Sequence, residues 1–291
     1  MSVSNGNVSK SIIAVNSMGG NCLQIFVSSP YTGKVSEKII AHYIKNGEAI
    51  KEVLAANNTK LFIHSPYVYN FAKSHNNRGW DKCYWVVDYI KELRIAHEIN
   101  AVGCVIHVGK YLELDPHEAE QNMYDSLCYV IGQMQEQQLK SYIILETGAG
   151  QGTEMFLTSN NSITNFSNFY NRFSDEQKNY IKICVDTCHI FSAGYDISDL
   201  RLCEKFFRDF DEHIGISNLV LIHLNDSKKG CCSCVDRHAN LGAGHIGKAS
   251  LSYIIQIAYG LRIPLVLETP DKDIEVHKEI ELIRDIVNKI K

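Results

Sequence analysis

Hydrophobic residues along the chain form short continuous runs separated by longer amphipathic stretches. The runs are rich in Leu, Ile and Val and occupy residues 23–27, 61–63, 103–106, 142–145, 181–185, 219–222 and 264–267. Most show no alternation with polar residues, which is typical of parallel strands covered on both faces. The stretches with apolar residues on one helical face are 36–56, 81–99, 116–138, 199–213, 249–259 and 276–289. This alternation predicts a parallel sheet closed as a TIM (β/α)8 barrel.

A first strand is the missing part of this barrel pattern. Residues 11–15 are apolar, but Val8, Ile12, Val15 and Met18 are spaced as on one helix face, and a Gly-Gly pair follows them. We therefore expect a helix here and a truncated first strand within residues 1–4. No linker interrupts the pattern, so we expect one domain over residues 1–291. Residues 226–247 form the longest stretch expected to lack regular structure, and loops of that length tend to be functional.

Composition excludes several classes of protein. The 291 residues are 45% apolar and 21% charged, and the formal net charge is −4. No run approaches the roughly 18–20 apolar residues of a membrane span, and the polar N-terminus does not have the layout of a secretion signal. The ten cysteines are dispersed, which favours reduced thiols in an intracellular, reducing compartment. A chain this acidic is no basic nucleic-acid coat, so any nucleic-acid contact requires a local site.

Imidazoles and carboxylates follow the predicted strands at one end. Six consecutive strand ends carry such a residue: His64, His107, Glu146, Asp186, His223 and Glu268. His189 comes three residues after Asp186, and the long loop adds Asp236 and His238. In a TIM barrel the chemistry lies at the C-terminal ends of the strands, so these nine side chains are expected around one mouth.

Nine such side chains at one mouth indicate bound metal ions. One His or Glu at a strand end is usually a satisfied polar residue. Four carboxylates and five imidazoles together would suffer repulsion and desolvation, and Arg237 is the one flanking cation that could offset them. Mixed His and carboxylate ligation with no thiolate at the strand ends favours zinc, with manganese or iron as substitutes. Three ions use all nine ligands and leave positions for water and substrate. Such a cluster favours phosphate-ester hydrolysis.

Several motifs surround these residues: His64-Ser65-Pro66-Tyr67, Glu146-Thr147, Gly150-Gln151-Gly152-Thr153, Cys184-Val185-Asp186-Thr187-Cys188-His189, His223-Leu224-Asn225-Asp226-Ser227-Lys228, Val235-Asp236-Arg237-His238 and Leu267-Glu268-Thr269. Together they resemble the motif set of the endonuclease IV family, zinc-dependent TIM-barrel enzymes that cut DNA at abasic sites. The resemblance covers nearly the whole chain.

The resemblance implies a ligand set and a reaction. It assigns His64, His107 and Glu146 to a first zinc; Glu146, Asp186, His223 and Glu268 to a second; and His189, Asp236 and His238 to a third. Glu146, as the bridge, is the implied catalytic residue. The implied reaction is hydrolysis of the phosphodiester 5′ to an abasic site by a metal-bound hydroxide. It leaves a 3′-hydroxyl and a 5′-deoxyribose phosphate, and 3′-end trimming is expected beside it. The expected partner is duplex DNA containing abasic sites, bound by a monomer.

The DNA-contacting residues depart from the family pattern. Tyr67 matches the intercalating Tyr of the family, whereas Tyr31 stands after Ser29-Pro30 where family members usually have Arg. We expect Tyr31 to replace that Arg in part by stacking on DNA. Arg237 is the third residue expected to contact DNA, although a solvated charged loop is the competing interpretation.

The sequence leaves two alternative functions open, and it also leaves open the role of one group of cysteines. A barrel of this kind also suits a metal-dependent sugar isomerase or epimerase, but that enzyme gives no purpose to His189, Asp236 and His238. The second alternative is a catalytically inactive binder of abasic DNA. Cys231, Cys232 and Cys234 precede Asp236 and are interpreted as reduced loop thiols; an extra metal site or a response to oxidation is the alternative.

Overall fold

The computed structural model describes residues 7–270 and 275–289. The chain divides into two compact units. The first unit comprises residues up to Leu145 together with Ser174–Lys182, and the second comprises Glu146–Phe173 and the chain from Ile183 onward. The prediction of one domain over residues 1–291 stays a prediction.

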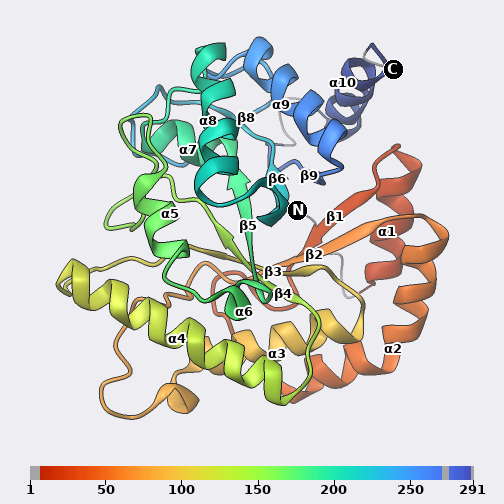
Figure 1. Cartoon of the computed structure of the whole chain (residues 1–291). Coiled ribbons are helices and arrows are strands. Elements are labelled where there is room, and N and C mark those ends of the chain that lie inside the picture. Colours follow the sequence, from red (N-terminus) through yellow and green to blue (C-terminus); the bar gives the residue numbers. More distant parts are fainter. Residues whose placement is uncertain (1–6, 271–274, 290–291) are drawn as a thin grey trace. The chain divides into compact units, whose positions relative to one another are not determined.

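Parallel strands with helices beside them build the first unit (Figure 1). The strands follow one another in the order β1 (Cys22–Ile25), β2 (Lys60–His64), β3 (Gly103–His107) and β4 (Tyr142–Glu146), and Glu146 itself belongs to the second unit. Leu23 pairs with Leu61, and Ile63 with Cys104. The helical elements are α1 (Val8–Ser17), α2 (Glu37–Ala56), η1 (Trp80–Lys82), α3 (Tyr84–Glu98), α4 (Pro116–Glu136) and α6 (Asp175–Lys178).

Local sequence signals explain where these helices begin. The Ser36 side chain accepts a hydrogen bond from the Ile39 amide at the start of α2, and the Asp115 side chain caps α4. Pro116 occupies the first turn of α4, where its missing N–H costs no hydrogen bond. Helix α2 then packs against both α1 and α3, and α3 packs against α4. These contacts bury the apolar faces recognised in the sequence.

The second unit also combines parallel strands with helices. Its strands β5 (Ile181–Asp186, which enters the unit at Ile183), β6 (Leu219–His223) and β9 (Leu265–Val266) are parallel, and Asp186 lies opposite His223. A separate antiparallel pair consists of β7 (Asp226–Ser227) and β8 (His238–Ala239). The helical elements are α5 (Thr164–Tyr170), α7 (Thr187–Ala193), α8 (Leu200–His213), η2 (Ile216–Asn218), α9 (Lys248–Leu261) and α10 (Val276–Asn288).

The seven predicted strands and the predicted first helix are confirmed, with bounds that differ by a few residues at most. The truncated first strand expected in residues 1–4 lies outside the described residues. The short helices α5, α6 and α7 have no counterpart among the predicted helices. Each is seven residues or shorter, which gives too few turns for an amphipathic period to be read.

The prediction that residues 226–247 lack regular structure holds for most of the segment and is wrong for the strands β7 and β8. Besides the β7–β8 pair, this segment is organised by the buried side chain of Asp226, which accepts backbone N–H groups from both of its ends. Its carboxylate accepts from Ser227 and Ile246 at 2.8 and 2.9 Å and from Gly242 and Gly244 at 3.0 Å each. At Gly244 a Cβ atom would lie 2.3 Å from the Ser227 carbonyl oxygen, so only glycine fits. Strands of two residues have no hydrophobic pattern that a sequence reading could detect.

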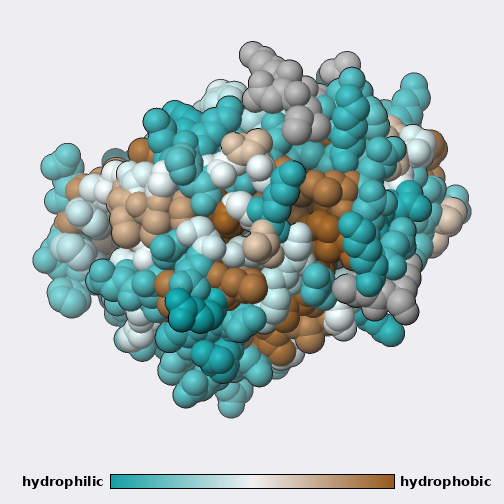
Figure 2. Space-filling view, turned by 90° about the horizontal axis from the view of Figure 1, so that it is seen from above, coloured by the Kyte–Doolittle hydropathy of each residue, from teal (hydrophilic) through white to brown (hydrophobic). Residues whose placement is uncertain are grey.

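The surface shows where apolar residues remain exposed. In Figure 2 one face of the molecule is mostly hydrophilic, with smaller hydrophobic patches between the polar regions. Among the described residues, no helix combines the length and apolar character needed to span a membrane. All ten cysteines lie within the described part of the chain, and none of them forms a disulfide.

Candidate metal centre

Seven of the nine predicted metal ligands belong to the second unit, where strand ends and one helix position them. Asp186 ends β5 and is also the N-cap of α7, because its Oδ1 accepts the His189 N–H at 2.9 Å. This cap fixes His189 on the first turn of α7, directly beside the strand end. His223 ends β6, Glu268 follows β9, and His238 begins β8.

Four of these residues form one group, here called the four-residue cluster: Glu146, Asp186, His223 and Glu268. One ligand atom from each lies within 4.8 Å of the others. His223 occupies the centre of the group. Its Nδ1 is 2.8 Å from Glu146 Oε1, 3.4 Å from Glu268 Oε2 and 3.8 Å from Asp186 Oδ2. All four side chains are at least nine-tenths buried.

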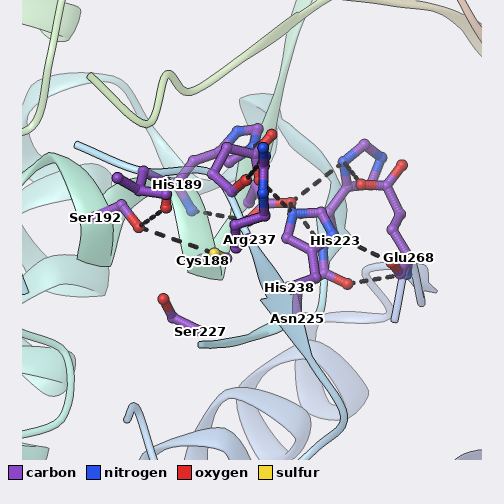
Figure 3. Close-up of polar contacts among 12 residues, drawn as sticks. Cys188, His189, Ser192, His223, Asn225, Ser227, Arg237, His238 and Glu268 are labelled. Carbon is purple, nitrogen blue, oxygen red and sulfur yellow. Dashed lines mark hydrogen bonds and ion pairs between the residues drawn. The ribbon is translucent and has the colours of Figure 1, made fainter. Parts of the chain in front are cut away.

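His189, Asp236 and His238 form the three-residue cluster, whose ligand atoms also lie within 4.8 Å of one another. The two Asp236 oxygens face the two imidazoles, at 3.3 Å from His189 Nε2 and 3.0 Å from His238 Nε2. His189 Nδ1 donates to the Thr147 carbonyl at 2.8 Å, and His238 Nδ1 donates to the Glu268 carbonyl at 3.1 Å. A carbonyl only accepts, so both rings turn their Nε2 atoms toward the cluster. Figure 3 shows His189, His223, His238 and Glu268 gathered in this region.

The two clusters are adjacent, and their charges perturb each other. His238 Nε2 lies 3.6 Å from Asp186 Oδ2. Burial raises the pKa of Asp186. Burial by itself lowers the pKa of His189, but Asp186, Asp236 and Glu146 together raise it well above its usual value. The pKa of His238 rises to about 9 in the same way, because the nearby carboxylates outweigh its burial. The titrating groups of the two clusters are therefore electrostatically coupled, and a bound dication would compete with protons for them.

The first unit holds the other two predicted ligands. His64 ends β2 and His107 ends β3, and their ring centroids are 5.2 Å apart in an edge-on arrangement. His64 is buried, and its Nδ1 donates to the Ser65 carbonyl at 2.7 Å, so its Nε2 is the nitrogen that can serve as a ligand. The Tyr67 ring lies 5.5 Å from the His64 ring and 5.8 Å from the His107 ring.

The predicted DNA-contacting residues are all exposed. Tyr31 and Tyr67 lie in the first unit with ring centroids 6.2 Å apart, and their exposed fractions are 76% and 47%. Arg237 lies in the second unit, exposed between the ligand candidates Asp236 and His238, and its guanidinium donates to the Asp236 carbonyl.

The thiols of Cys184 and Cys188 lie close to the clusters, whereas the sequence analysis expected no thiolate at the strand ends. The Sγ of Cys184 lies within 4.8 Å of ligand atoms of Glu146 and His223, and that of Cys188 is equally close to Asp186 and His238. Burial raises the pKa of Cys184 to about 12 and that of Cys188 to about 11, so both are neutral thiols. The spacing offers a signal for Cys184: it stands two residues before Asp186 in β5, and such residues share one face of a strand.

Cys231, Cys232 and Cys234 belong to neither of the two clusters. The Cys231 and Cys232 sulfurs are 3.8 Å apart. The backbone N–H groups of Cys232 and Cys234 donate to the Phe191 and Ser192 carbonyls near the end of α7. These hydrogen bonds therefore anchor the loop that leads to Asp236. The interpretation of the three cysteines as reduced loop thiols stays a prediction.

The donor set of the second unit fits divalent metal ions. Each cluster combines carboxylate oxygens and imidazole nitrogens that converge within one ligand sphere, and hydrogen bonds to carbonyls orient two of the imidazoles. Such mixed sets suit zinc, manganese and iron. The donor set is therefore compatible with a bound metal ion.

Comparison with known proteins places this site within a family. A family model described as "Xylose isomerase-like TIM barrel" matches residues 12–288, which confirms the predicted TIM barrel. "Probable endonuclease 4" of Halothermothrix orenii is 33% identical over 276 residues, which cover 93% of this chain and 94% of that protein. The protein of the same name from Aster yellows witches'-broom phytoplasma is 33% identical over 288 residues, or 96% and 91% of the two chains. The chain belongs to the endonuclease IV family, as the motifs predicted.

Solved structures show the same fold. Endonuclease IV from Thermus thermophilus superposes with a TM-score of 0.73 at 21% identity, covering 99% of this chain and 96% of that one. A D-tagatose 3-epimerase-like protein reaches a TM-score of 0.67 at 16% identity, covering 93% and 89%. Enzymes of different chemistry therefore share this architecture, and the function must be argued from the site.

Proposed function

We propose that this protein is a metal-dependent DNA repair endonuclease that hydrolyses the phosphodiester 5′ to abasic sites in duplex DNA. The products would be a 3′-hydroxyl and a 5′-deoxyribose phosphate, with 3′-end trimming as a further activity. One observation carries the proposal: the two adjacent ligand clusters of the second unit, in a chain 33% identical to proteins named endonuclease 4.

The ligand roles follow from the clusters and from the family resemblance. The four-residue cluster would hold one ion and the three-residue cluster another. The family resemblance assigns the roles of His64 and His107 as metal ligands and the bridging role of Glu146. With three ions in all, the site would use every predicted ligand. We propose zinc as the metal, with manganese or iron as substitutes.

Divalent ions at such a site lower the pKa of bound water and stabilise charge on a leaving oxygen. The protein side chains would hold and orient this centre. His189 and His238 are fixed by carbonyl acceptors, and Asp186 is fixed by the first turn of α7. No separate protein nucleophile is needed, which agrees with the neutral thiols of Cys184 and Cys188. We propose Tyr67, Tyr31 and Arg237 as the residues that contact DNA.

A sugar isomerase or epimerase is the second candidate because a D-tagatose 3-epimerase-like protein shares the fold. The three-residue cluster disfavours it. His189, Asp236 and His238 form a complete ligand group beside the four-residue cluster, and an isomerase that needs one or two ions has no use for them.

Cleavage of a duplex carrying one abasic-site analogue tests the proposal. The protein is incubated with this duplex and with its undamaged counterpart, with and without a chelator, and the product ends are mapped. We expect one cut 5′ to the lesion, abolished by the chelator. A cut on the 3′ side, or equal cutting of the undamaged duplex, would contradict the proposed reaction. An inactive binder would retain the damaged duplex in a binding assay and produce no cut.

A further inference from the structure

Asn225 touches two residues of the four-residue cluster without being a ligand candidate. It follows His223 by two residues and is fully buried. Its Nδ2 donates to Asp186 Oδ2 at 2.7 Å, and its Oδ1 accepts the Glu268 backbone N–H at 2.9 Å. Figure 3 shows Asn225 beside Glu268 in this network. One side chain therefore joins the strand end of β5 to the segment that follows β9.

The partners of Asn225 fix the orientation of its amide. A carboxylate accepts and a backbone N–H donates, so only an NH2 group toward Asp186 and an oxygen toward Glu268 satisfy both contacts. The backbone of Asn225 is also held. The hydroxyl of Thr187 donates to the Asn225 carbonyl at 2.6 Å and accepts the Asn225 N–H at 2.8 Å. Aspartate has no such donor when ionised, and Ala has neither group, so the position requires an amide.

Asn225 is one of two hydrogen-bond partners that hold the Asp186 carboxylate, and one of two that hold the Glu268 backbone. Asp186 Oδ1 accepts the His189 N–H at 2.9 Å while Oδ2 accepts from Asn225, so its carboxylate is fixed from two sides. The backbone of Glu268 is held by Asn225 at its N–H and by His238 Nδ1 at its carbonyl. Residues that hold metal ligands in this way usually tune metal affinity.

We propose that Asn225 is a positioning residue that preorganises the four-residue cluster for its metal ion. Its amide sets the carboxylate of Asp186 and the backbone of Glu268 in the arrangement that binds the ion. This inference rests on the proposed metal centre. It concerns metal affinity, so it is tested by metal binding rather than by DNA cleavage.

The test compares the parent protein with Asn225→Asp and Asn225→Ala. Zinc affinity is measured by competition with a chromophoric chelator, and melting temperature is measured for metal-stripped and zinc-restored protein. We expect affinity for one class of ion to fall about 10- to 100-fold in both variants. The rise in melting temperature that zinc produces should shrink accordingly, because bound ligand stabilises in proportion to the logarithm of its affinity. Asn225→Ala adds no charge, so it keeps the test meaningful if Asn225→Asp fails to fold.

Asn240→Asp is the matched control. Asn240 is also buried in the second unit, and its Nδ2 donates at 3.0 Å to the carboxylate of Glu279, which is not a ligand candidate. The same substitution beside a similar partner should lower both melting temperatures equally and leave the zinc-induced rise intact. A purely structural role for Asn225 would give that same pattern, and this result would overturn the inference.

The parent protein separates failure of the inference from failure of the metal centre. If the parent shows neither zinc binding nor a zinc-induced rise in melting temperature, the proposed centre itself is wrong. If the parent binds zinc and both Asn225 variants bind it equally well, the centre stands and the positioning role of Asn225 is refuted.

Discussion

A buried carboxyl group in the first unit leads to a pH-dependent prediction about stability. Glu92 lies on α3 with its side chain completely buried. Ser65 Oγ donates to Glu92 Oε2 at 2.6 Å, and Ser28 Oγ donates to Oε1 at 3.4 Å. Burial raises the pKa of Glu92 to about 8 despite these two hydrogen bonds. The group is therefore mostly neutral at neutral pH in the folded protein, although it is ionised in the unfolded chain.

The expected size of the effect follows from the difference in pKa. A group whose pKa is higher in the folded state stabilises fully below its unfolded pKa, here 4.5, and that stability is lost as pH rises toward 8. At about 1.4 kcal/mol per pKa unit, the loss is about 3 kcal/mol near pH 7 and about 5 kcal/mol once pH exceeds the folded-state value. Glu92→Gln keeps the shape of the neutral carboxyl group and cannot ionise, so it should escape this loss.

Chemical denaturation between about pH 5 and pH 9 measures the effect as the free energy of unfolding of each protein. The difference between Glu92→Gln and the parent should increase in favour of the variant as pH rises, and then level off above about pH 8. Glu52→Gln, at an exposed position on α2, is the matched control and should show no such trend. A difference that stays constant across this range would refute a neutral Glu92 in the fold.

Four further predictions concern the proposed function. Elemental analysis of carefully purified protein should return about three ions per chain, mostly zinc, and one ion or fewer with full activity would contradict three sites. Glu146→Gln should lower cleavage by several orders of magnitude while the fold survives, and more than about a tenth of the parent rate would exclude a bridging role. Tyr67→Ala should weaken binding to abasic duplex about 5- to 150-fold with metal content unchanged, whereas a variant that bound damaged and intact duplex as the parent does would move recognition to another loop. Tyr31→Arg should steepen the salt dependence of binding by about one phosphate contact, and an unchanged slope would show that Tyr31 does not face DNA.

Much of the fold was predictable because its periodic signals are strong. Buried strands such as β3 and β5 are continuous apolar runs, and long helices such as α2 carry a capping Ser and a regular apolar face. The segment from Asp226 to Gly247 was missed for a physical reason. Its order comes from one buried carboxylate that gathers four backbone N–H groups, three of them distant in sequence, and a local pattern does not contain that information.

The ligand residues of the site could be predicted one by one because they lie at strand ends. The contacts that support these ligands could not be predicted. Asp186, His223 and Glu268 could be chosen because each follows or ends a hydrophobic run, and parallel strands end on one edge. Asn225 has no comparable signal. Its importance appears only when its two partners, which lie 39 residues before it and 43 residues after it, are seen in contact with one amide.

The choice between phosphodiester hydrolysis and sugar isomerisation depends on the three-residue cluster more than on the fold. The TM-scores of 0.73 and 0.67 against an endonuclease and an epimerase-like protein show that one architecture serves both. The four-residue cluster also fits both chemistries, because a carboxylate-rich site with one His can bind a metal in either. His189 and His238, in contrast, each have one nitrogen fixed on a carbonyl and the other directed at Asp236, which indicates a second ligand group oriented in advance. An additional ion there would favour an enzyme that must stabilise a leaving oxygen as well as generate a nucleophile, and this requirement belongs to phosphodiester hydrolysis.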